Sequence, residues 1–141
     1  MKKIKYLLIL ITLELFLTAM GMGVPIFLIV FGFFFGFFLA RKILVLNRKN
    51  SLRTIFNHSL LASGFSFLIM LGIWGTYFLN IFDKNFDIVN SGIPMILYEP
   101  FASFIGWTVL MIFISPFLQF LMALFGAYVV LIFISSSKQV N

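Results

Sequence analysis

The sequence predicts an all-α protein: a polytopic integral membrane bundle, with four transmembrane helices as the favoured count, in one domain of residues 1–141. Of the 141 residues, 62% are hydrophobic and 10% are charged, whereas soluble domains carry roughly 25% charged residues. A small soluble domain leaves much of its surface exposed, so it could not hide this many apolar side chains. The apolar residues also gather in runs that approach or exceed the about 20 residues a helix needs to cross a bilayer.

The first apolar run, residues 6–40, is too long for one span. As a single helix its roughly 35 residues would extend about 50 Å. The glycines and the proline of Gly21–Pro25 end one helix and start another, which predicts a tight hairpin with spans over 4–20 and 25–40. Because a second apolar run follows at once, we interpret the N-terminal run as a retained span, not a cleaved signal peptide.

A basic cytoplasmic loop is expected over 41–53, where five of thirteen residues are basic and none is acidic. A third span follows over 54–79, then an outer loop and interfacial segment over 80–104 and a last span over 105–134. Basic residues in short loops stay cytoplasmic. With both termini inside, nine basic residues lie inside and only Lys84 lies outside.

The stretch from 93 to 116 leaves three readings open. The apolar block that contains it is long for one upright span and short for two. Ser115-Pro116 can start a helix or kink one. The stretch can belong to a long kinked span, to an interfacial segment over 93–104 that feeds a span from 105, or to a re-entrant piece before a span from Ser115. We favour the second reading. A fifth span would place the C-terminus outside.

Glu14 is the residue best able to carry chemistry. It lies roughly 14 Å beyond the start of its span, where a carboxylate costs several kcal/mol unless it is paired, protonated or hydrated. It can be a proton or cation site, a protonated acid that bonds across the bundle, or a contact with a partner chain. Thr18 shares its stripe. Ser115 and Gln119 lie on the polar stripe of the last span, where Gln119 is a candidate to face Glu14.

Other positions point to packing and to the membrane interface. Gly32 and Gly36 form a small-xxx-small pair of the kind that lets membrane helices approach closely. Trp74 and Trp107 are expected in an interfacial aromatic belt. Asn57 and the single histidine are expected at the inner end of the third span, and one histidine cannot build a usual zinc site. A set of basic residues is expected to contact anionic lipid: Arg41, Lys42, Arg48, Lys49, Arg53, beside His58 and Asn57.

The composition excludes several functions. The net charge of +6 lies beside apolar runs, which indicates orientation signals and lipid contacts, not nucleic acid. With no cysteine, disulfides, thiolate nucleophiles and iron–sulfur clusters are excluded. The chain carries no phosphate loop, metal motif or serine elbow. We therefore predict no catalytic residue, metal or cofactor.

Three functions remain. The first is a non-catalytic subunit, or a lipid- or partner-binding component of a membrane assembly, as a homo- or hetero-oligomer. The second is a proton- or cation-coupled transporter using Glu14. Four short spans with one acidic residue in the first resemble the small multidrug resistance transporters, which implies a coupling role for Glu14, although their surrounding motifs are not visible here. The third, a lipid-modifying enzyme, would need a second acid or base near Glu14 or Glu99.

Overall fold

The computed structural model describes residues 8–9, 11–17, 25–45, 51–83, 86–89 and 92–139, and every regular element in them is a helix. Residues 8–9 and 11–17 are helical and are called the N-terminal segment. The remaining elements are α2 (Ile26–Val45), α3 (Ser51–Leu79), the 3-10 turn η1 (Asn80–Phe82), α4 (Pro100–Val109), the π-helical turn η2 (Leu110–Ile114) and α5 (Ser115–Gln139).

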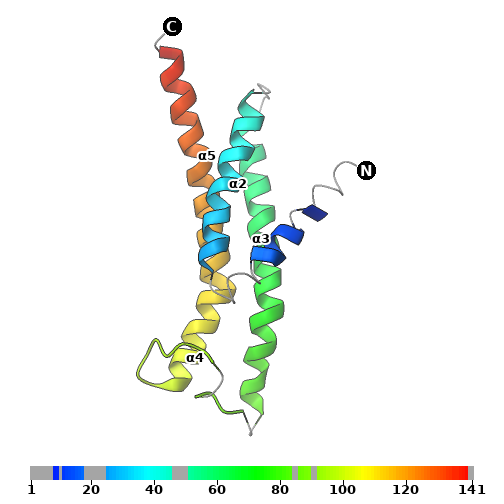
Figure 1. Cartoon of the computed structure of the whole chain (residues 1–141), viewed down its shortest axis with the longest axis vertical. Coiled ribbons are helices and arrows are strands. Elements are labelled where there is room, and N and C mark those ends of the chain that lie inside the picture. Colours follow the sequence, from blue (N-terminus) through cyan, green and yellow to red (C-terminus); the bar gives the residue numbers. More distant parts are fainter. Residues whose placement is uncertain are drawn as a thin grey trace.

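The long helices form an elongated bundle (Figure 1). Gly32 of α2 lies against Gln119 of α5, and Gly36 lies against Ala123. Since the residue numbers of the two helices rise in the same direction along this contact, α2 and α5 run parallel. α3 runs antiparallel to both. α2 accompanies only part of the length of its neighbours, and beyond the start of α2, α3 runs beside η2 and α4 (Figure 1).

Three helices are long and apolar enough to cross a membrane: Ile26–Ile43, Ser51–Phe82 and Pro100–Ile134. This agrees with an all-helical membrane protein and with three of the expected spans. The fourth, over 4–20, falls only partly on described residues, as does the hairpin at Gly21–Pro25. The four-helix count therefore stays a prediction, as do the cytoplasmic termini.

The last helix starts earlier than the sequence indicated. It begins at Pro100, inside the segment expected to be interfacial, because the fixed φ of proline suits the first helical turn. It continues through α4, η2 and α5 to Gln139. Of the three readings for 93–116, the long kinked span agrees best with this continuous helix, which is irregular only at η2. Ser115 lies inside the helix, so the re-entrant reading does not fit.

Pro116 explains the π-helical turn η2. A proline lacks the N–H for a regular helical bond and clashes with the preceding turn. The helix absorbs this by widening, so the N–H of Ser115 bonds to the carbonyl of Leu110, five residues back. The extra residue keeps one side of the helix buried along its whole length: Phe104 and Thr108 before η2, Met111 within it, and Ser115, Gln119 and Ala123 after it.

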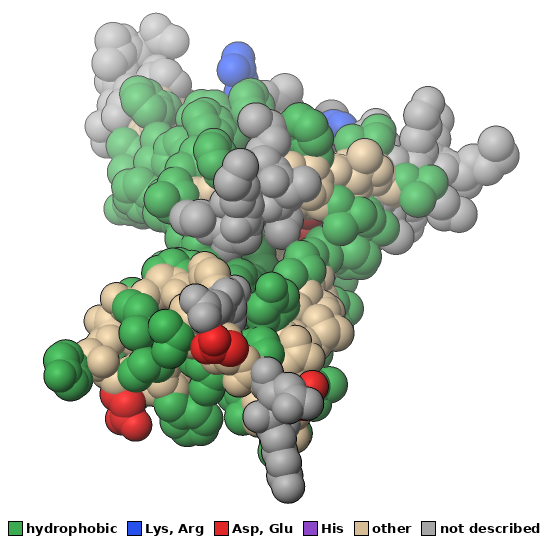
Figure 2. All heavy atoms as spheres, turned by 60° about the horizontal axis from the view of Figure 1, so that its bottom comes forward, with side chains coloured by type: hydrophobic (Ala, Val, Ile, Leu, Met, Phe, Trp, Pro, Cys, Tyr) green, Lys and Arg blue, Asp and Glu red, His purple; other side chains and the backbone are tan. Residues whose placement is uncertain are grey.

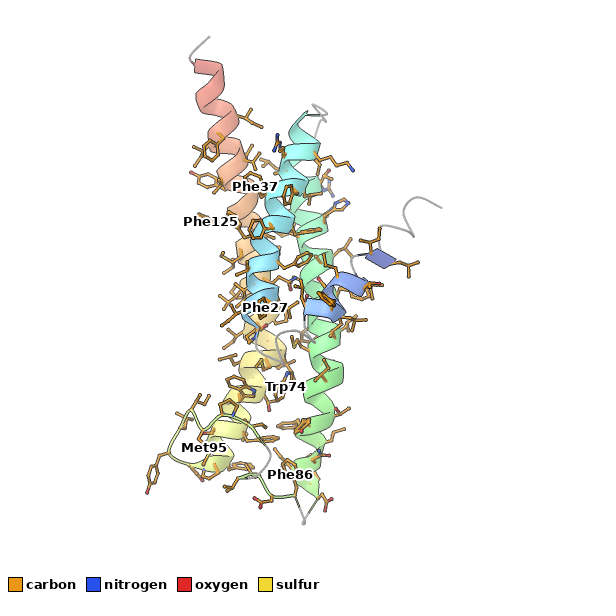
Figure 3. The ribbon with its side chains drawn as sticks, viewed as in Figure 1. Phe27, Phe37, Trp74, Phe86, Met95 and Phe125 are labelled. Atoms are coloured by element: carbon orange, nitrogen blue, oxygen red, sulfur yellow. The ribbon has the colours of Figure 1, made fainter. Side chains whose placement is uncertain are left out.

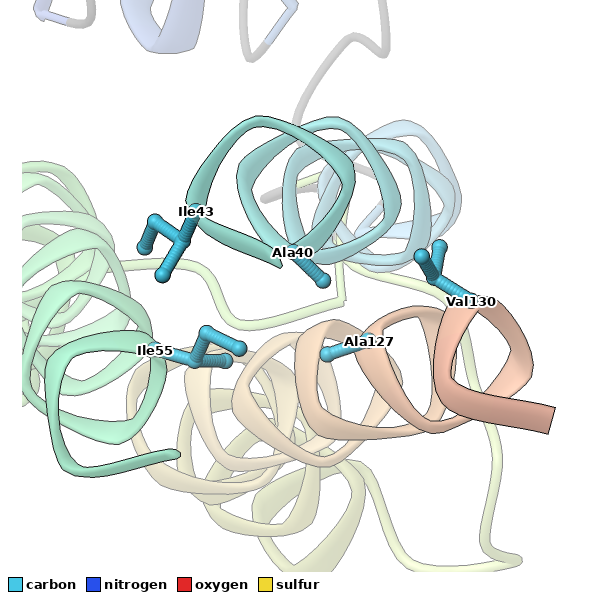
Figure 4. Packing of buried hydrophobic residues seen from close by; sticks show 5 residues of the cluster. All are labelled: Ala40, Ile43, Ile55, Ala127 and Val130. Carbon is cyan, nitrogen blue, oxygen red and sulfur yellow. The ribbon is translucent and has the colours of Figure 1, made fainter. Parts of the chain in front are cut away.

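Small residues bring α2 and α5 into backbone contact. A Cβ built on Gly36 would lie 1.8 Å from the Ala123 carbonyl oxygen, and one built on Gly126 would lie 2.2 Å from the Phe33 carbonyl oxygen. Only glycine fits such an approach, as in other membrane helix pairs. Toward one end, α2, α3 and α5 enclose a small apolar core (Figure 4): Ala40, Ile43, Ile55, Ala127, Val130.

The two ends of the bundle differ in charge. The basic end carries exposed Arg41, Lys42 and Arg53. The acidic end holds the loop residues 83, 86–89 and 92–99, where red carboxylates lie among green apolar side chains (Figure 2). Ser103 of α4 ties down this loop, since its Oγ accepts from the Leu97 N–H at 2.7 Å and donates to the Leu97 carbonyl at 2.8 Å. Phe86 packs edge-on against Phe104 at 5.8 Å (Figure 3).

Candidate functional site

A buried polar cluster joins the N-terminal segment to α5 and α3. The Gln119 Nε2 donates a hydrogen bond to the Glu14 Oε1 at 3.2 Å. Both side chains are buried, with exposed fractions of 0% for Glu14 and 2% for Gln119. The contact predicted between these two residues is present. It places a carboxyl group against the amide of a helix more than a hundred residues later in the chain.

Serines of α3 line the other side of this cluster. Ser66 lies beside the Glu14 carboxyl group and is 1% exposed. One turn earlier, the Ser63 Oγ donates to the Pro116 carbonyl oxygen at 2.8 Å. Together with Glu14 and Gln119, these serines and Ser115 are called the polar cluster below.

The polar cluster lies deep in apolar surroundings. Gly32, which touches Gln119, is about 9 Å from the start of α2 and about 20 Å from its end at 1.5 Å per residue. Ionisable side chains at such depth in membrane helices are costly, and they pair with one another or with polar neighbours. The hydrogen bond from Gln119 supplies this pairing for Glu14.

Several oxygens of the cluster have spare hydrogen-bonding capacity. The buried Ser115 Oγ and Gln119 Oε1 have no hydrogen-bond partner among the described residues. Hydroxyl and amide oxygens are hard ligands that suit a proton, a water or a small cation. Among the described residues there is no group of three or more His, Asp or Glu side chains that could hold a metal ion.

The remaining predicted positions are dispersed. Asn57 and His58 are exposed near the start of α3, and the His58 Nδ1 lies 2.7 Å from the Thr54 carbonyl. Trp74 and Trp107 meet edge-on at 6.3 Å between α3 and α4, a contact that the sequence did not predict. Gly32 and Gly36 lie at the close α2–α5 contact. Thr18, Arg48 and Lys49 lie outside the described residues.

A second candidate site is the outward face of α3, which sequence reasoning missed. A Cβ built on Gly64 or on Gly72 would meet nothing within 4 Å. Exposed leucines alternate with these glycines at helical spacing, and the whole set is called the open stripe: Leu61, Gly64, Leu68, Gly72, Gly75 and Leu79. The available signal was the recurrence of glycine three to eight residues apart in one apolar helix.

No protein family, curated protein or solved structure matches this chain. The class defined by the fold is that of helical membrane proteins, with three helices able to cross a bilayer.

Proposed function

We propose that the chain is a non-catalytic component of a membrane assembly, which packs against another membrane helix through the open stripe of α3. The observation that carries this proposal is the open space beside Gly64 and Gly72. Glycine costs about 1 kcal/mol relative to alanine inside a helix. Gly36 and Gly126 offset that cost by close contact within the chain, whereas the glycines of α3 make no such contact.

The leucines of the open stripe support the same proposal. Leu61, Leu68 and Leu79 are 71%, 60% and 63% exposed. Each stands beside a glycine, which gives the surface projections and hollows of the kind that interlock when two helices pack. Interfaces between membrane helices are enriched in small residues, whereas a surface that meets only lipid tails gains nothing from them.

A non-catalytic role is consistent with the burial and hydrogen bonding of Glu14. Glu14 is fully enclosed and bonded to Gln119 within the same chain, so its carboxyl group ties helices together in this conformation. By the distribution of basic residues, we further propose that the basic end is cytoplasmic and that both termini lie on that side.

Single-cysteine crosslinking in native membranes tests the open stripe, because the sequence has no cysteine of its own. Leu68→Cys places the thiol at the centre of the stripe. Phe117→Cys is the control, since Phe117 has a similar exposure of 57% but lies on another helix, α5. We expect Leu68→Cys to form a specific crosslinked species, either a homodimer or an adduct of defined mass with a second subunit.

Adding Gly64→Leu and Gly72→Leu should remove that crosslink, because the new side chains fill the hollows. Equal crosslinking of Leu68→Cys and Phe117→Cys would instead indicate random collision in the bilayer. A chain that remains monomeric in its native membrane, with no crosslink from the stripe, contradicts the proposal.

The polar cluster supports a second candidate function, proton- or cation-coupled transport. The specific observation is a buried carboxyl group beside the Ser66 hydroxyl and the unpartnered oxygens of Ser115 and Gln119. On this hypothesis, Glu14→Gln abolishes proton-linked flux in liposomes. Ser59→Ala is the control: it changes a buried serine of α3 outside the polar cluster and should leave the flux unchanged. Flux that persists in Glu14→Gln rules out this role for the carboxylate.

A further inference from the structure

A groove of about 550 Å³ opens between α3 and α5 at the basic end. This volume is in the range of small-molecule sites, roughly 300–1,000 Å³. Its walls are almost entirely apolar, with Leu52 and Phe56 from α3 facing Leu124 and Leu131 from α5. The α5 wall extends about 10 Å along the helix axis at 1.5 Å per residue.

An aromatic contact lies at the end of the groove nearest the middle of the bundle. Phe56 meets Phe120 edge-on at 5.4 Å, and Phe120 lies one turn before Leu124 toward the middle of the bundle. The groove therefore starts as an apolar recess and runs toward the basic end. Its apolar lining suits a chain of methylene groups.

Two polar side chains stand at the rim of this recess. Arg53 and Tyr128 contribute to its lining, and both are exposed. A guanidinium presents a planar set of donors that matches phosphate oxygens. Tyrosine prefers positions where its ring meets lipid tails and its hydroxyl reaches the headgroups.

The charge at this end favours an anionic lipid over a zwitterionic one. None of the four acidic side chains lies here: Glu14 is enclosed in the polar cluster, and Asp83, Asp87 and Glu99 belong to the loop at the acidic end. The ammonium group of a zwitterionic headgroup held at the groove would meet Arg53 without a counter-charge. A headgroup with net negative charge meets only attraction.

We propose that this groove holds one acyl chain of an anionic phospholipid, with the lipid phosphate bound by Arg53. The site is separate from the open stripe. Phe56 lies roughly 120° around α3 from Leu68, the centre of the open stripe, at 100° per residue. The lipid site and the assembly surface are therefore on different faces of α3, and each proposal can be tested without the other.

Native mass spectrometry of the purified full chain in mild detergent tests this lipid site. The probes are dioleoyl phosphatidylglycerol and dioleoyl phosphatidylcholine at equal concentration. We expect one phosphatidylglycerol to be retained per chain, at least about fivefold more tightly than phosphatidylcholine. Arg53→Gln should weaken phosphatidylglycerol binding about fivefold, the effect of one basic residue near the surface. The control Arg41→Gln, exposed on α2, should weaken it by less than about twofold.

A groove-filling variant separates the acyl chain from the charge. Leu124→Trp should remove retained lipid of either headgroup while circular dichroism stays helical, and Leu131→Trp repeats the test if the first variant does not fold. Equal binding of the two lipids overturns the proposal, as does an equal effect of Arg53→Gln and Arg41→Gln. A second copy of the chain that covers the groove, seen as a dimer without lipid, also counts against it.

Discussion

Gln119 of α5 donates a hydrogen bond to Glu14 of the N-terminal segment across 105 residues of sequence, over 3.2 Å and with both side chains buried. This contact between two polar side chains fixes where the N-terminal segment meets the bundle. In apolar surroundings it is also selective, because sliding the segment by one residue would leave the carboxyl group without its amide donor.

Removing the amide should destabilise the chain more than removing both partners. We expect Gln119→Leu to lower the free energy of unfolding by about 1–3 kcal/mol, since Glu14 then loses a buried hydrogen-bond donor. Adding Glu14→Leu should recover part of this loss. Reversible unfolding in lipid–detergent micelles measures all four corners of the double-mutant cycle. Effects that simply add, with no coupling energy, would show that the two residues do not stabilise each other.

Adding a methyl group should have opposite effects at two glycines. Gly36→Ala places a carbon 1.8 Å from the Ala123 carbonyl oxygen. Because backbone must then move, we expect a loss of about 1–3 kcal/mol. Gly64→Ala meets nothing within 4 Å, so it should be neutral or stabilise the single chain by up to about 1 kcal/mol. Thermal unfolding in dilute detergent compares them, and a similar loss in both variants contradicts the close α2–α5 contact.

Replacing either of two buried serines of α3 with alanine should have different effects on stability. Ser63 donates to the Pro116 carbonyl at 2.8 Å, whereas the Ser59 Oγ has no partner among the described residues. Interhelical hydrogen bonds in membranes average about 0.6 kcal/mol, and this is the loss we expect for Ser63→Ala. For Ser59→Ala we expect no loss. A larger effect for Ser59→Ala in equilibrium unfolding would mean that the Ser63 bond does not hold α3 to α5.

The loop at the acidic end should loosen when Ser103 is replaced. Ser103→Ala removes both hydrogen bonds to Leu97, so amide hydrogen exchange over residues 92–99 should accelerate. Thr108→Val is the control, because the Thr108 hydroxyl bonds only to the Phe104 carbonyl of its own helix. Mass spectrometry of exchanged peptides measures the difference. Unchanged exchange in Ser103→Ala would show that other contacts hold the loop.

The π-helical turn predicts an unusual tolerance to deletion. Removing Phe113 together with Pro116→Ala should convert η2 to regular helix and keep the buried residues before and after it in line. Removing Leu121 from α5 should rotate everything beyond it by about 100° and abolish folding. Expression level and monodispersity in detergent distinguish the two. Equal failure of both deletions contradicts the role assigned to η2.

Hydropathy predicted the long helices well, because lipid and backbone hydrogen bonding leave few alternatives to a helix. The helix from Pro100 was harder to predict. Ser115-Pro116 is compatible with a start or a kink, and only the packing of Ser63 against the Pro116 carbonyl and the widened turn decide for a continuous helix. The sequence has no pattern that marks such a turn in advance.

Part of the polar cluster also followed from the sequence. Glu14 and Gln119 were paired because both are costly in lipid and each needs a partner. The contact between Trp74 and Trp107 and the groove beside Arg53 were not predictable. They depend on how α3 and α5 are rotated about their axes, and hydropathy does not determine rotation.

The unequal lengths of the helices have a consequence for the choice of membrane. The apolar span of α2, Ile26–Ile43, is about 27 Å long, and the span that joins α3 to η1, Ser51–Phe82, is about 48 Å long. One bilayer with a core about 30 Å thick cannot match both. A thick membrane must become thinner around α2. In a thin membrane, α3 must tilt more or extend further beyond the hydrocarbon core. The protein should therefore sort with lipid chain length, and its stability should peak in bilayers whose thickness matches the span of α2.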